Sequence, residues 1–204
     1  MKVRFLLMVA MIILCANSSF AQKHEIAFTS GGLKVGERGF NLPNPGFLKF
    51  KTGFTYEINY ARRLVDAKLA ALYVEVPLAG TPRTKVTGSN ALSPRSYSSL
   101  FVATGLKLKL IPGAKYSPFA MTGVGLSRFN TSSTAINEQA NPNQQSETDG
   151  VFYIGGGLDV KLISKLSLRG EVRDFYSEIP PLNINALRTR QHNTLISAGL
   201  VINF

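Results

Sequence analysis

Cysteine is almost absent from this chain of 204 residues, and the single one, Cys15, lies close to the N-terminus. After residue 21 no thiol remains, which excludes a disulfide, a cysteine nucleophile and a cysteine metal site from that part of the chain. Long hydrophobic runs are missing there as well, because no later segment has the roughly 18 uninterrupted apolar residues of a membrane-spanning helix. Any crossing of a membrane by this part must therefore use strands.

Acidic residues are scarce too. The chain carries 23 Lys and Arg against 12 Asp and Glu, and setting Lys2 and Arg4 aside leaves an excess of nine positive charges. Such an excess suits nucleic acid, an anionic membrane surface, or charges paired within the fold. No basic tract is interleaved with stacking aromatic residues, and an exported chain rarely meets nucleic acid. We therefore expect no nucleic-acid partner.

The first 21 residues have the organisation of a secretory signal peptide. A basic start is followed by an apolar run that ends at Cys15, and the small residues Ser19 and Ala21 occupy the two positions that a signal peptidase reads. The segment is too short and wrongly flanked for a membrane helix. The sequence therefore predicts a signal peptide over residues 1–21 and one exported domain over residues 22–204.

Alternation of apolar with small or polar residues dominates the exported part. At the C-terminal end Phe204, Ile202 and Leu200 alternate with Asn203 and Val201, and a period of two indicates a strand. Each of the strands that we predict is close to the roughly 9–11 residues that a tilted strand needs to cross a bilayer. The predicted strands are 24–33, 52–63, 68–78, 99–110, 117–128, 151–162, 166–176 and 193–204.

The connections between these strands alternate in length. Short turns are expected near Asp66, at Pro112-Gly113 and around Ser164, whereas the other connections are long and contain chain-breaking and polar residues. Alternating long and short connections predict an up-and-down barrel with both termini on the periplasmic side. The third long connection is polar and acidic, and we expect it to be mobile. The long connections cover about 34–51, 79–98, 129–150 and 177–192.

Charged residues fall on one face of the predicted strands, together with the glycines Gly105, Gly155 and Gly157. Solvent-facing strand positions have no reason to be small, whereas the lumen of a narrow barrel must mix small and large side chains. The pattern therefore favours aliphatic residues outside and charges inside. In the strand 117–128 the faces do not resolve, and we favour Ala120, Val124 and Leu126 as outward. The predicted lumen charge network is Glu57, Glu75, Lys107, Lys109, Asp159, Lys161, Arg169, Glu171 and Arg173.

The register of one hairpin can be predicted from its charges. Placing Asp159 opposite Arg169 also places Gly157 opposite Glu171 and matches the faces of the two strands. The neighbouring face-matched register sets Asp159 against Glu171, and like charges directly opposite are unfavourable. We predict the first register, with the turn around Ser164.

No catalytic or metal constellation is evident. The two histidines, His24 and His192, are expected at opposite ends of the barrel, so they do not form a metal pair. His192 and Thr194 resemble the His-x-Ser of an outer-membrane lipid A deacylase. However, the hydroxyl is a threonine and no acidic residue follows it. We predict that the protein is not an enzyme and that it has no cofactor and no metal site.

The strand sequences Phe-Tyr-Ile-Gly-Gly-Gly-Leu-Asp-Val-Lys-Leu (152–162) and Leu-Ser-Leu-Arg-Gly-Glu-Val-Arg (166–173), with the terminal Phe204, resemble the family of small OmpA/OmpX-like outer-membrane β-barrels. The resemblance implies an all-β fold, an eight-stranded antiparallel up-and-down transmembrane barrel in the outer membrane of a Gram-negative bacterium. It also implies a monomer, escorted by periplasmic chaperones, whose Phe204 is the signal read by the outer-membrane insertion machinery.

Function is expected to reside in the loops of such a barrel. Eight strands leave an interior only wide enough for side chains, so we expect the charge network to fill it, although a narrow gated pore is an alternative.

The leading interpretation is a structural or surface-interaction protein of the outer membrane. A soluble periplasmic lipocalin-like carrier and a lipid-modifying enzyme are the alternatives. Basic loop residues are predicted to contact lipopolysaccharide phosphates through charge-assisted bonds, with solvated loop charge as the alternative; they are Arg83, Lys85, Arg95, Arg188 and Arg190.

Overall fold

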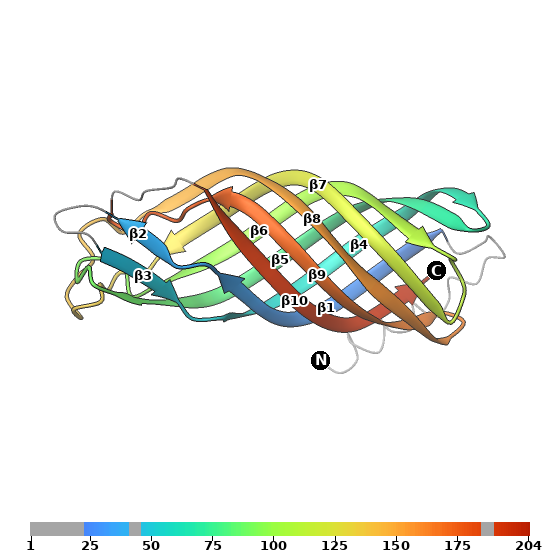
Figure 1. Ribbon diagram of the computed structural model, residues 1–204, viewed down its shortest axis with the longest axis horizontal. Coiled ribbons are helices and arrows are strands. Elements are labelled where there is room, and N and C mark those ends of the chain that lie inside the picture. The colour runs from blue at the N-terminus through green and yellow to red at the C-terminus, as the bar shows by residue number, and fades with distance from the viewer. Residues whose placement is uncertain (1–22, 41–45, 185–189) are drawn as a thin grey trace, which may run out of the picture.

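The computed structural model describes residues 23–40, 46–184 and 190–204, and this part of the chain consists of strands and connections (Figure 1). No helix in the described part is long and apolar enough to cross a membrane. The strands are β1 (His24–Val35), β2 (Arg38–Phe40), β3 (Gly46–Phe50), β4 (Gly53–Ala67), β5 (Ala70–Gly88), β6 (Ser96–Leu110), β7 (Tyr116–Thr131), β8 (Ser146–Ile163), β9 (Leu166–Glu178) and β10 (Arg190–Asn203).

Eight of these strands form a closed antiparallel ring in the order β5-β4-β1-β10-β9-β8-β7-β6, which the pairing of β6 with β5 completes. This confirms the predicted eight-stranded up-and-down barrel. Following directly paired residues around the ring from Lys34 returns to β1 at His24, a stagger of ten residues. A stagger of this kind requires strands that are inclined to the barrel axis, as Figure 1 shows.

The short connections after β4, β6 and β8 lie at one end of the barrel, which we call the turn end, together with the C-terminus (Figure 1). His24 is at this end too, because its backbone is hydrogen-bonded to Phe204. The turns at Pro112-Gly113 and around Ser164 are confirmed. The turn expected near Asp66 is displaced, because β4 continues to Ala67 and the chain reverses over Lys68 and Leu69. Lys68 has a φ of 38°, a conformation that usually selects glycine or asparagine, so no turn residue marked this position in the sequence.

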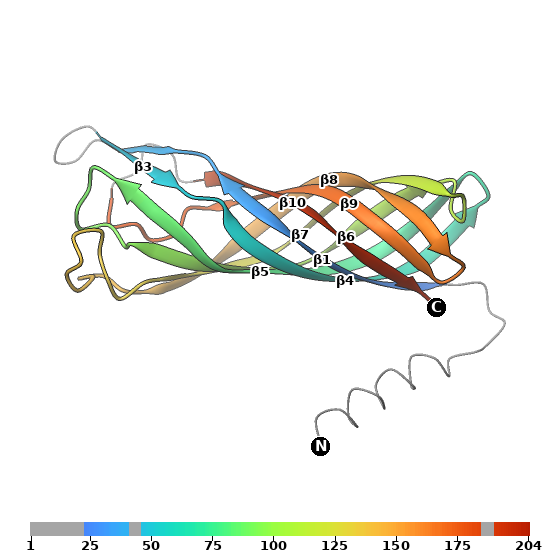
Figure 2. The ribbon, with the colours of Figure 1, turned by 90° about the horizontal axis from the view of Figure 1, so that it is seen from below.

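The opposite end, which we call the loop end, is more regular than the sequence predicted. β5 extends to Gly88 rather than to residue 78, and Lys85 pairs with Ser96 at the start of β6. Within the first long connection, β2 and β3 form an additional hairpin that pairs with β5 through Leu48 and Gly88. Figure 2 shows this hairpin beside the loop end of β5. Parts of the expected loops therefore continue the barrel wall beyond the transmembrane region.

Hydrogen bonds tie the third long connection, which we expected to be mobile, to its neighbours. The backbone N–H of Ile136 donates to the carbonyl of Ser93 at 2.9 Å, which ties this connection to the second one. The Ser93 hydroxyl donates to the carbonyl of Leu182 at 2.8 Å, and the Asn183 side chain donates to Asn141 Oδ1 at 2.8 Å. Hydrogen bonds thus join the described parts of the connections after β5, β7 and β9 into one cap.

Exposure settles which face of each strand is outward. Leu106 and Leu168 are 48% and 46% exposed, whereas Lys107 and Arg169 are fully buried. In β7, Val124 and Leu126 are exposed, as favoured from the sequence, and Ala120 shares their face. The aliphatic rows therefore form the outer wall and the charged rows face the lumen. This arrangement is the reverse of a lipocalin-like barrel, whose lumen is apolar.

Candidate functional site

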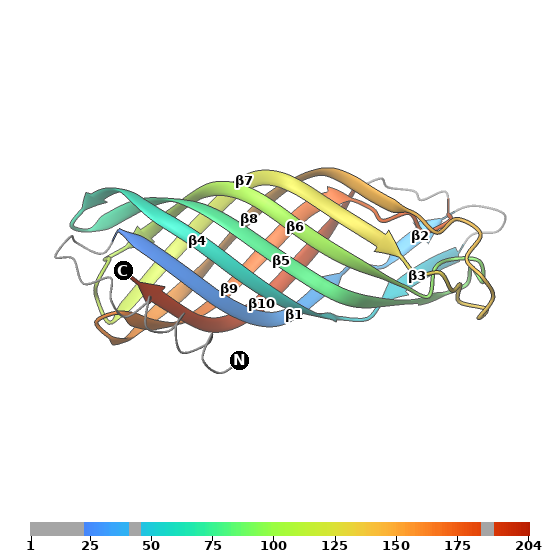
Figure 3. The ribbon, with the colours of Figure 1, turned by 180° about the vertical axis from the view of Figure 1, so that it is seen from behind.

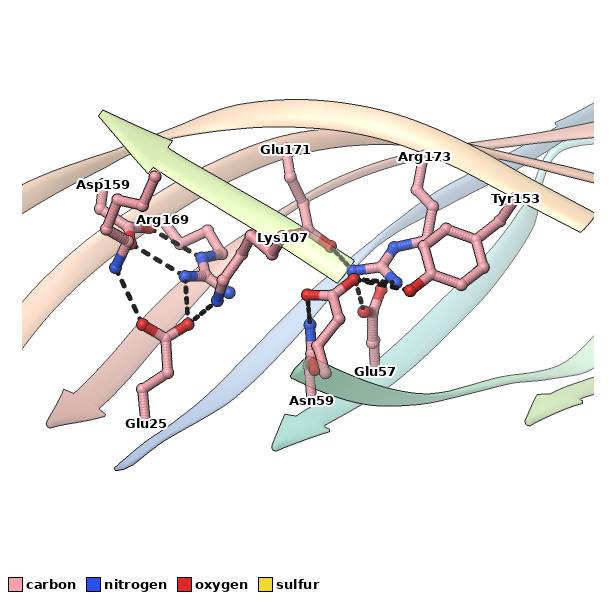
Figure 4. Close-up of polar contacts among 11 residues, drawn as sticks. Glu25, Glu57, Asn59, Lys107, Tyr153, Asp159, Arg169, Glu171 and Arg173 are labelled. Atoms are coloured by element: carbon pink, nitrogen blue, oxygen red, sulfur yellow. Dashed lines mark hydrogen bonds and ion pairs between the residues drawn. The ribbon is translucent and has the colours of Figure 1, made fainter. Parts of the chain in front are cut away.

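The lumen contains two clusters of charged side chains, which Figure 4 shows as separate groups. The first, nearer the turn end, comprises Glu25, Lys107, Lys109, Asp159 and Arg169, and we call it the lower cluster. Arg169 binds Asp159 through two bonds, Nε to Oδ1 at 2.7 Å and Nη2 to Oδ2 at 2.9 Å. Lys109 Nζ lies 2.8 Å from Glu25 Oε2 and 2.6 Å from Asp159 Oδ2. Lys107 donates to Glu25 as well, so two carboxylates serve three buried cations.

The register predicted for the β8–β9 hairpin is confirmed. Asp159 stands opposite Arg169 and Gly157 opposite Glu171. A register shift between Lys161 and Ile163 pairs Ile163 with Leu166. Two residues therefore connect the strands, rather than the three that the predicted register requires. The bidentate bond of the lower cluster is therefore a direct consequence of how the charges alternate along the two strands.

The second group, which we call the upper cluster, lies further toward the loop end and consists of Glu57, Glu75, Glu171 and Arg173. Arg173 Nη2 lies 3.0 Å from Glu57 Oε1 and 3.6 Å from Glu171 Oε1, and Nη1 lies 3.3 Å from Glu75 Oε1. Tyr153 adds a hydroxyl that donates to Glu75 at 2.9 Å. One guanidinium thus holds three carboxylates, a balance opposite to that of the lower cluster.

The predicted lumen charge network needs two corrections. Lys161 lies outside it, because it is exposed at the turn end and donates to the carbonyl of Gly113 at 3.3 Å. Glu25, which the prediction omitted, is 1% exposed and binds all three cations of the lower cluster. A signal was present, since Glu25 and Ala27 alternate with Ile26 in β1. The other eight predicted lumen residues are buried.

Glycines on the lumen face make room for Tyr153. A Cβ added at Gly105 would lie 2.3 Å from the Tyr153 hydroxyl, and one at Gly123 would lie 2.6 Å from its ring. Toward the loop end, the rings of Phe101 and Phe175 stack with centroids 4.5 Å apart. Large side chains therefore fill the lumen above the charge clusters, and the mixture of small and large residues inferred from the sequence is present.

A polar cavity of about 520 Å³ opens at the turn end of the barrel. Arg63, Asp66 and Lys161 line it, and Lys109 and Asp159 of the lower cluster also contribute to its wall. Arg63 and Asp66 form an ion pair of 2.8 Å at this mouth. Water can thus approach the lower cluster from the turn end, while the upper cluster and the aromatic side chains lie beyond it.

The outer wall places His192 and Thr194 beside an acidic residue that sequence reasoning did not find. Asp174, on the neighbouring strand β9, lies 2.5 Å from His192 Nδ1 and accepts a hydrogen bond from the Thr194 hydroxyl at 3.2 Å. The acid therefore precedes the pair in the chain rather than following it. The hydroxyl is bonded to the carboxylate and not to the imidazole, so the arrangement lacks the nucleophile–base bond of a hydrolytic triad.

The basic residues predicted to contact lipid occupy different positions. Arg83 and Lys85 are exposed near the loop end of β5, and Arg190 lies 5.7 Å from the ring of Tyr176 on the outer wall. Arg95 instead forms an ion pair of 3.2 Å with Glu138 within the cap. Arg188 falls outside the described residues.

The chain termini of the barrel meet at the turn end. His24 and Phe204 exchange backbone hydrogen bonds of 2.9 Å, and their rings stack with centroids 5.7 Å apart. His192 lies near the loop end, which confirms that the two histidines are a full strand apart. Among the described residues, no group of three or more His, Cys, Asp or Glu side chains could hold a metal ion.

An acidic pair stands at the loop end of β8, beyond the aliphatic belt. Partial burial and the neighbouring Asp149 and Glu178 raise the pKa of Glu147 above its ordinary value. Burial also raises the pKa of Asp149, with Glu178 as the second cause. Glu147 is exposed and Asp149 is half-buried, and neither belongs to the two charge clusters of the lumen.

A closed ring of eight tilted strands, an aliphatic outer wall and an ionic lumen define a small β-barrel of the outer-membrane type. No protein-family model and no curated protein matches the sequence. Solved structures do match. Neisserial surface protein A has a TM-score of 0.60 and 14% identity, over 89% of this chain and 97% of that one. OprG of Pseudomonas aeruginosa has a TM-score of 0.56 and 12% identity, over 90% and 96%.

A third similar structure is Ail, the attachment invasion locus protein of Yersinia pestis, in complex with the heparin analogue sucrose octasulfate. Its TM-score is 0.51 and its identity 11%, over 90% of this chain and all of that one. The predicted likeness to small outer-membrane barrels is therefore confirmed at the level of the fold. At such identities the likeness carries the fold alone.

Proposed function

We propose that this protein is an integral outer-membrane barrel that supports the permeability barrier by binding lipopolysaccharide at its loop end. The observation that carries the proposal is the order of residues on the outer wall. A belt of exposed aliphatic side chains is followed, toward the loop end, by exposed cations on four barrel strands. These cations are Lys34, Arg83, Lys85, Arg128 and Arg190.

The position of these cations suits a lipid headgroup. A Lys or Arg on the lipid-facing wall costs about 2–4 kcal/mol at the bilayer midplane and only about 0–1 kcal/mol near the interfaces. No ion pair with an acidic residue involves Arg83, Lys85 or Arg128 in the described part of the chain, which leaves them available to phosphates. The Ail complex supports the proposal indirectly, because that barrel of the same fold holds a polyanion.

The lumen clusters have a structural role in this proposal. Buried charges cost several kcal/mol each unless they are paired and hydrogen-bonded, and the lower cluster pairs each of its five charged groups. The cap offers a surface for attachment to other cells or surfaces, which is a second role that the proposal allows. Its basis is that the connections after β5, β7 and β9 bind one another.

The test combines deletion with charge reversal. Cells that lack the protein should become sensitive to large hydrophobic antibiotics, and cells that carry Arg83→Glu with Lys85→Glu should resemble them. The matched control is Lys68→Glu with Lys115→Glu, which reverses two exposed charges at the turn end and should leave the barrier intact.

Fractionation tests the location separately. The protein should remain with the outer membrane and migrate faster on gels before heating than after it. Release by osmotic shock would contradict the membrane assignment. A barrier that fails on deletion and survives reversal of Arg83 and Lys85 would show that these cations do not hold the lipid.

A further inference from the structure

A groove of about 360 Å³ runs over the outer face of β4, β5 and β6. These three strands lie at the front of the ribbon in Figure 3. Tyr56, Ile58, Leu78 and Leu100 form its apolar sides. Its floor is Gly80, which pairs with Tyr56 on one side and with Leu100 on the other. The wall is therefore hollowed where an outward side chain is missing from the centre of three strands.

Neither the backbone nor close packing requires the glycine at this position. A Cβ added at Gly80 would meet only Leu100 Cδ1, at 3.8 Å, which is an ordinary contact. By contrast, a Cβ at the lumen-facing Gly105 would lie 2.2 Å from the carbonyl oxygen of Thr122. The lumen glycine thus allows a close approach of other groups, whereas Gly80 only leaves outward space unfilled.

Cations stand at the loop end of this groove. Arg83 follows Pro82, which lines the groove, and Lys85 lies further along the same strand. Arg128 pairs directly with Leu100, so it approaches the groove from β7. All three side chains are exposed. The polar residue Asn130 completes this end and donates to the Ser98 hydroxyl at 3.4 Å.

We propose that this groove binds one acyl chain of a phosphorylated lipid of the lipid A class, with its phosphates at Arg83, Lys85 and Arg128. The proposal rests on the lipopolysaccharide binding proposed above and assigns it a site. An acyl chain covers the apolar sides over Gly80, and charge-assisted bonds fix the headgroup at the loop end.

The spacing of the cations favours a ligand with more than one phosphate. Arg83 and Lys85 are on β5 and Arg128 is on β7, with β6 between them. Arg128 is level with Gly80 through Leu100, whereas Arg83 lies three residues further along β5. Two strand spacings of about 4.8 Å and a rise of about 3.3 Å per residue separate the backbones of Arg83 and Arg128 by roughly 14 Å. A single phosphate does not span this distance while contacting both, whereas a headgroup with two phosphates does.

The decisive variant fills the groove. Gly80→Leu adds an outward aliphatic side chain without a backbone clash, and Gly170→Leu is its matched control on β9, where a Cβ would meet nothing within 4 Å. Each refolded full-length protein is mixed with bis-phosphorylated lipid A and examined by native mass spectrometry. We expect one retained lipid A on the wild type and on Gly170→Leu, and about tenfold weaker retention on Gly80→Leu.

A second measurement covers the case in which Gly80→Leu does not fold. In a Cys15→Ser background, Gly80→Cys is the single cysteine of the chain, and its reaction with a maleimide can be followed in the folded barrel. Bis-phosphorylated lipid A should slow this reaction, and the same lipid should leave Gly170→Cys unaffected. Equal reaction rates with and without lipid A would overturn the proposal.

The outcomes of these experiments distinguish a failure of the groove proposal from a failure of the proposed lipopolysaccharide binding on which it rests. If Gly80→Leu binds lipid A as the wild type does, while Arg83→Glu with Lys85→Glu does not, the groove is excluded and the proposed function stands. If neither variant loses lipid A, both are overturned. If dephosphorylated lipid A or phosphatidylglycerol is retained as well as bis-phosphorylated lipid A, the assigned ligand class is wrong.

Discussion

Arg169 and Glu25 are hydrogen-bonded across the lumen, with Nη2 2.9 Å from Oε1, although 144 residues separate them in the chain. The bond joins β9 to β1, which are not neighbours in the ring because β10 lies between them. Glu25 also binds Lys107 and Lys109 of β6, which lies three strands away from β1 in the other direction around the ring. The lower cluster therefore braces the ring from within as well as filling it.

Removing the Glu25 charge should strongly destabilise the barrel. In Glu25→Gln, Asp159 alone remains to balance Lys107, Lys109 and Arg169, and breaking a buried ion pair costs about 3–5 kcal/mol. The control is Glu37→Gln, because Glu37 forms only an exposed pair with Lys49 at 3.3 Å, worth about 0–1 kcal/mol.

Urea titration in lipid vesicles measures the unfolding midpoint of both Glu variants. The chain has no tryptophan, so the folded fraction is best followed by gel mobility without heating. Equal midpoints for Glu25→Gln and Glu37→Gln would show that the lower cluster does not hold the barrel together.

In the upper cluster, the loss of stability on removing the cation should be partly recovered by removing carboxylate charges as well. Arg173→Met leaves Glu57, Glu75 and Glu171 without their cation and should cost about 3–5 kcal/mol. Adding Glu57→Gln and Glu171→Gln removes two of the uncompensated charges and should recover much of that loss. Unfolding free energies from a mutant cycle would measure the coupling. A triple variant no more stable than Arg173→Met would contradict the electrostatic account.

Lumen glycines should tolerate no side chain. Gly105→Ala brings a Cβ to within 2.2 Å of a backbone carbonyl and 2.3 Å of the Tyr153 hydroxyl, and overpacking of this kind costs about 1–3 kcal/mol. Gly170→Ala, on the outer wall, meets nothing and should be neutral or slightly stabilising. Refolding yield and urea midpoint in vesicles provide the comparison. Equal stability of the two variants would mean that the lumen adapts more readily than its packing indicates.

The sequence predicted what depends on neighbouring strands and missed what depends on the whole ring. The pair Asp159–Arg169 followed from alternation and like-charge repulsion within one hairpin. The contact of Glu25 with Arg169 depends on the ten-residue stagger of the ring, which no local pattern determines. The position of Asp174 beside His192 depends in a similar way on the register between β9 and β10, which pairs Asp174 with Thr194.

The loop end was the least predictable part. Its order comes from hydrogen bonds between connections that are distant in sequence, such as that from Ser93 to Leu182, and polar loop composition does not reveal them. At the turn end, the turn over Lys68 and Leu69 was not predicted either, because it contains neither glycine nor asparagine. Barrel wall and lumen therefore follow from periodicity, whereas the cap follows from tertiary contacts.

The His192 site should not hydrolyse lipid A. The Thr194 hydroxyl donates to Asp174 rather than to the imidazole, so the imidazole, which is the base of a hydrolytic triad, is not positioned to take its proton. Mass spectrometry of lipid A incubated with the refolded protein should show no loss of acyl chains, and Thr194→Ala should be indistinguishable from the wild type. Release of a fatty acid by the wild type but not by Thr194→Ala would instead identify Thr194 as a nucleophile.

Finally, the filled lumen should not conduct ions. The polar cavity at the turn end reaches Lys109 and Asp159, but beyond them the stacked Phe101 and Phe175 lie in the path to the loop end. Planar bilayers containing the wild type should therefore show no steady current. Replacing both phenylalanines by alanine shortens the obstruction from the loop end, yet Arg173 and its carboxylates still span the interior, so we expect at most brief openings. A stable open state of the wild type would mean that the clusters rearrange into a path, and the gated-pore alternative would then replace the structural role.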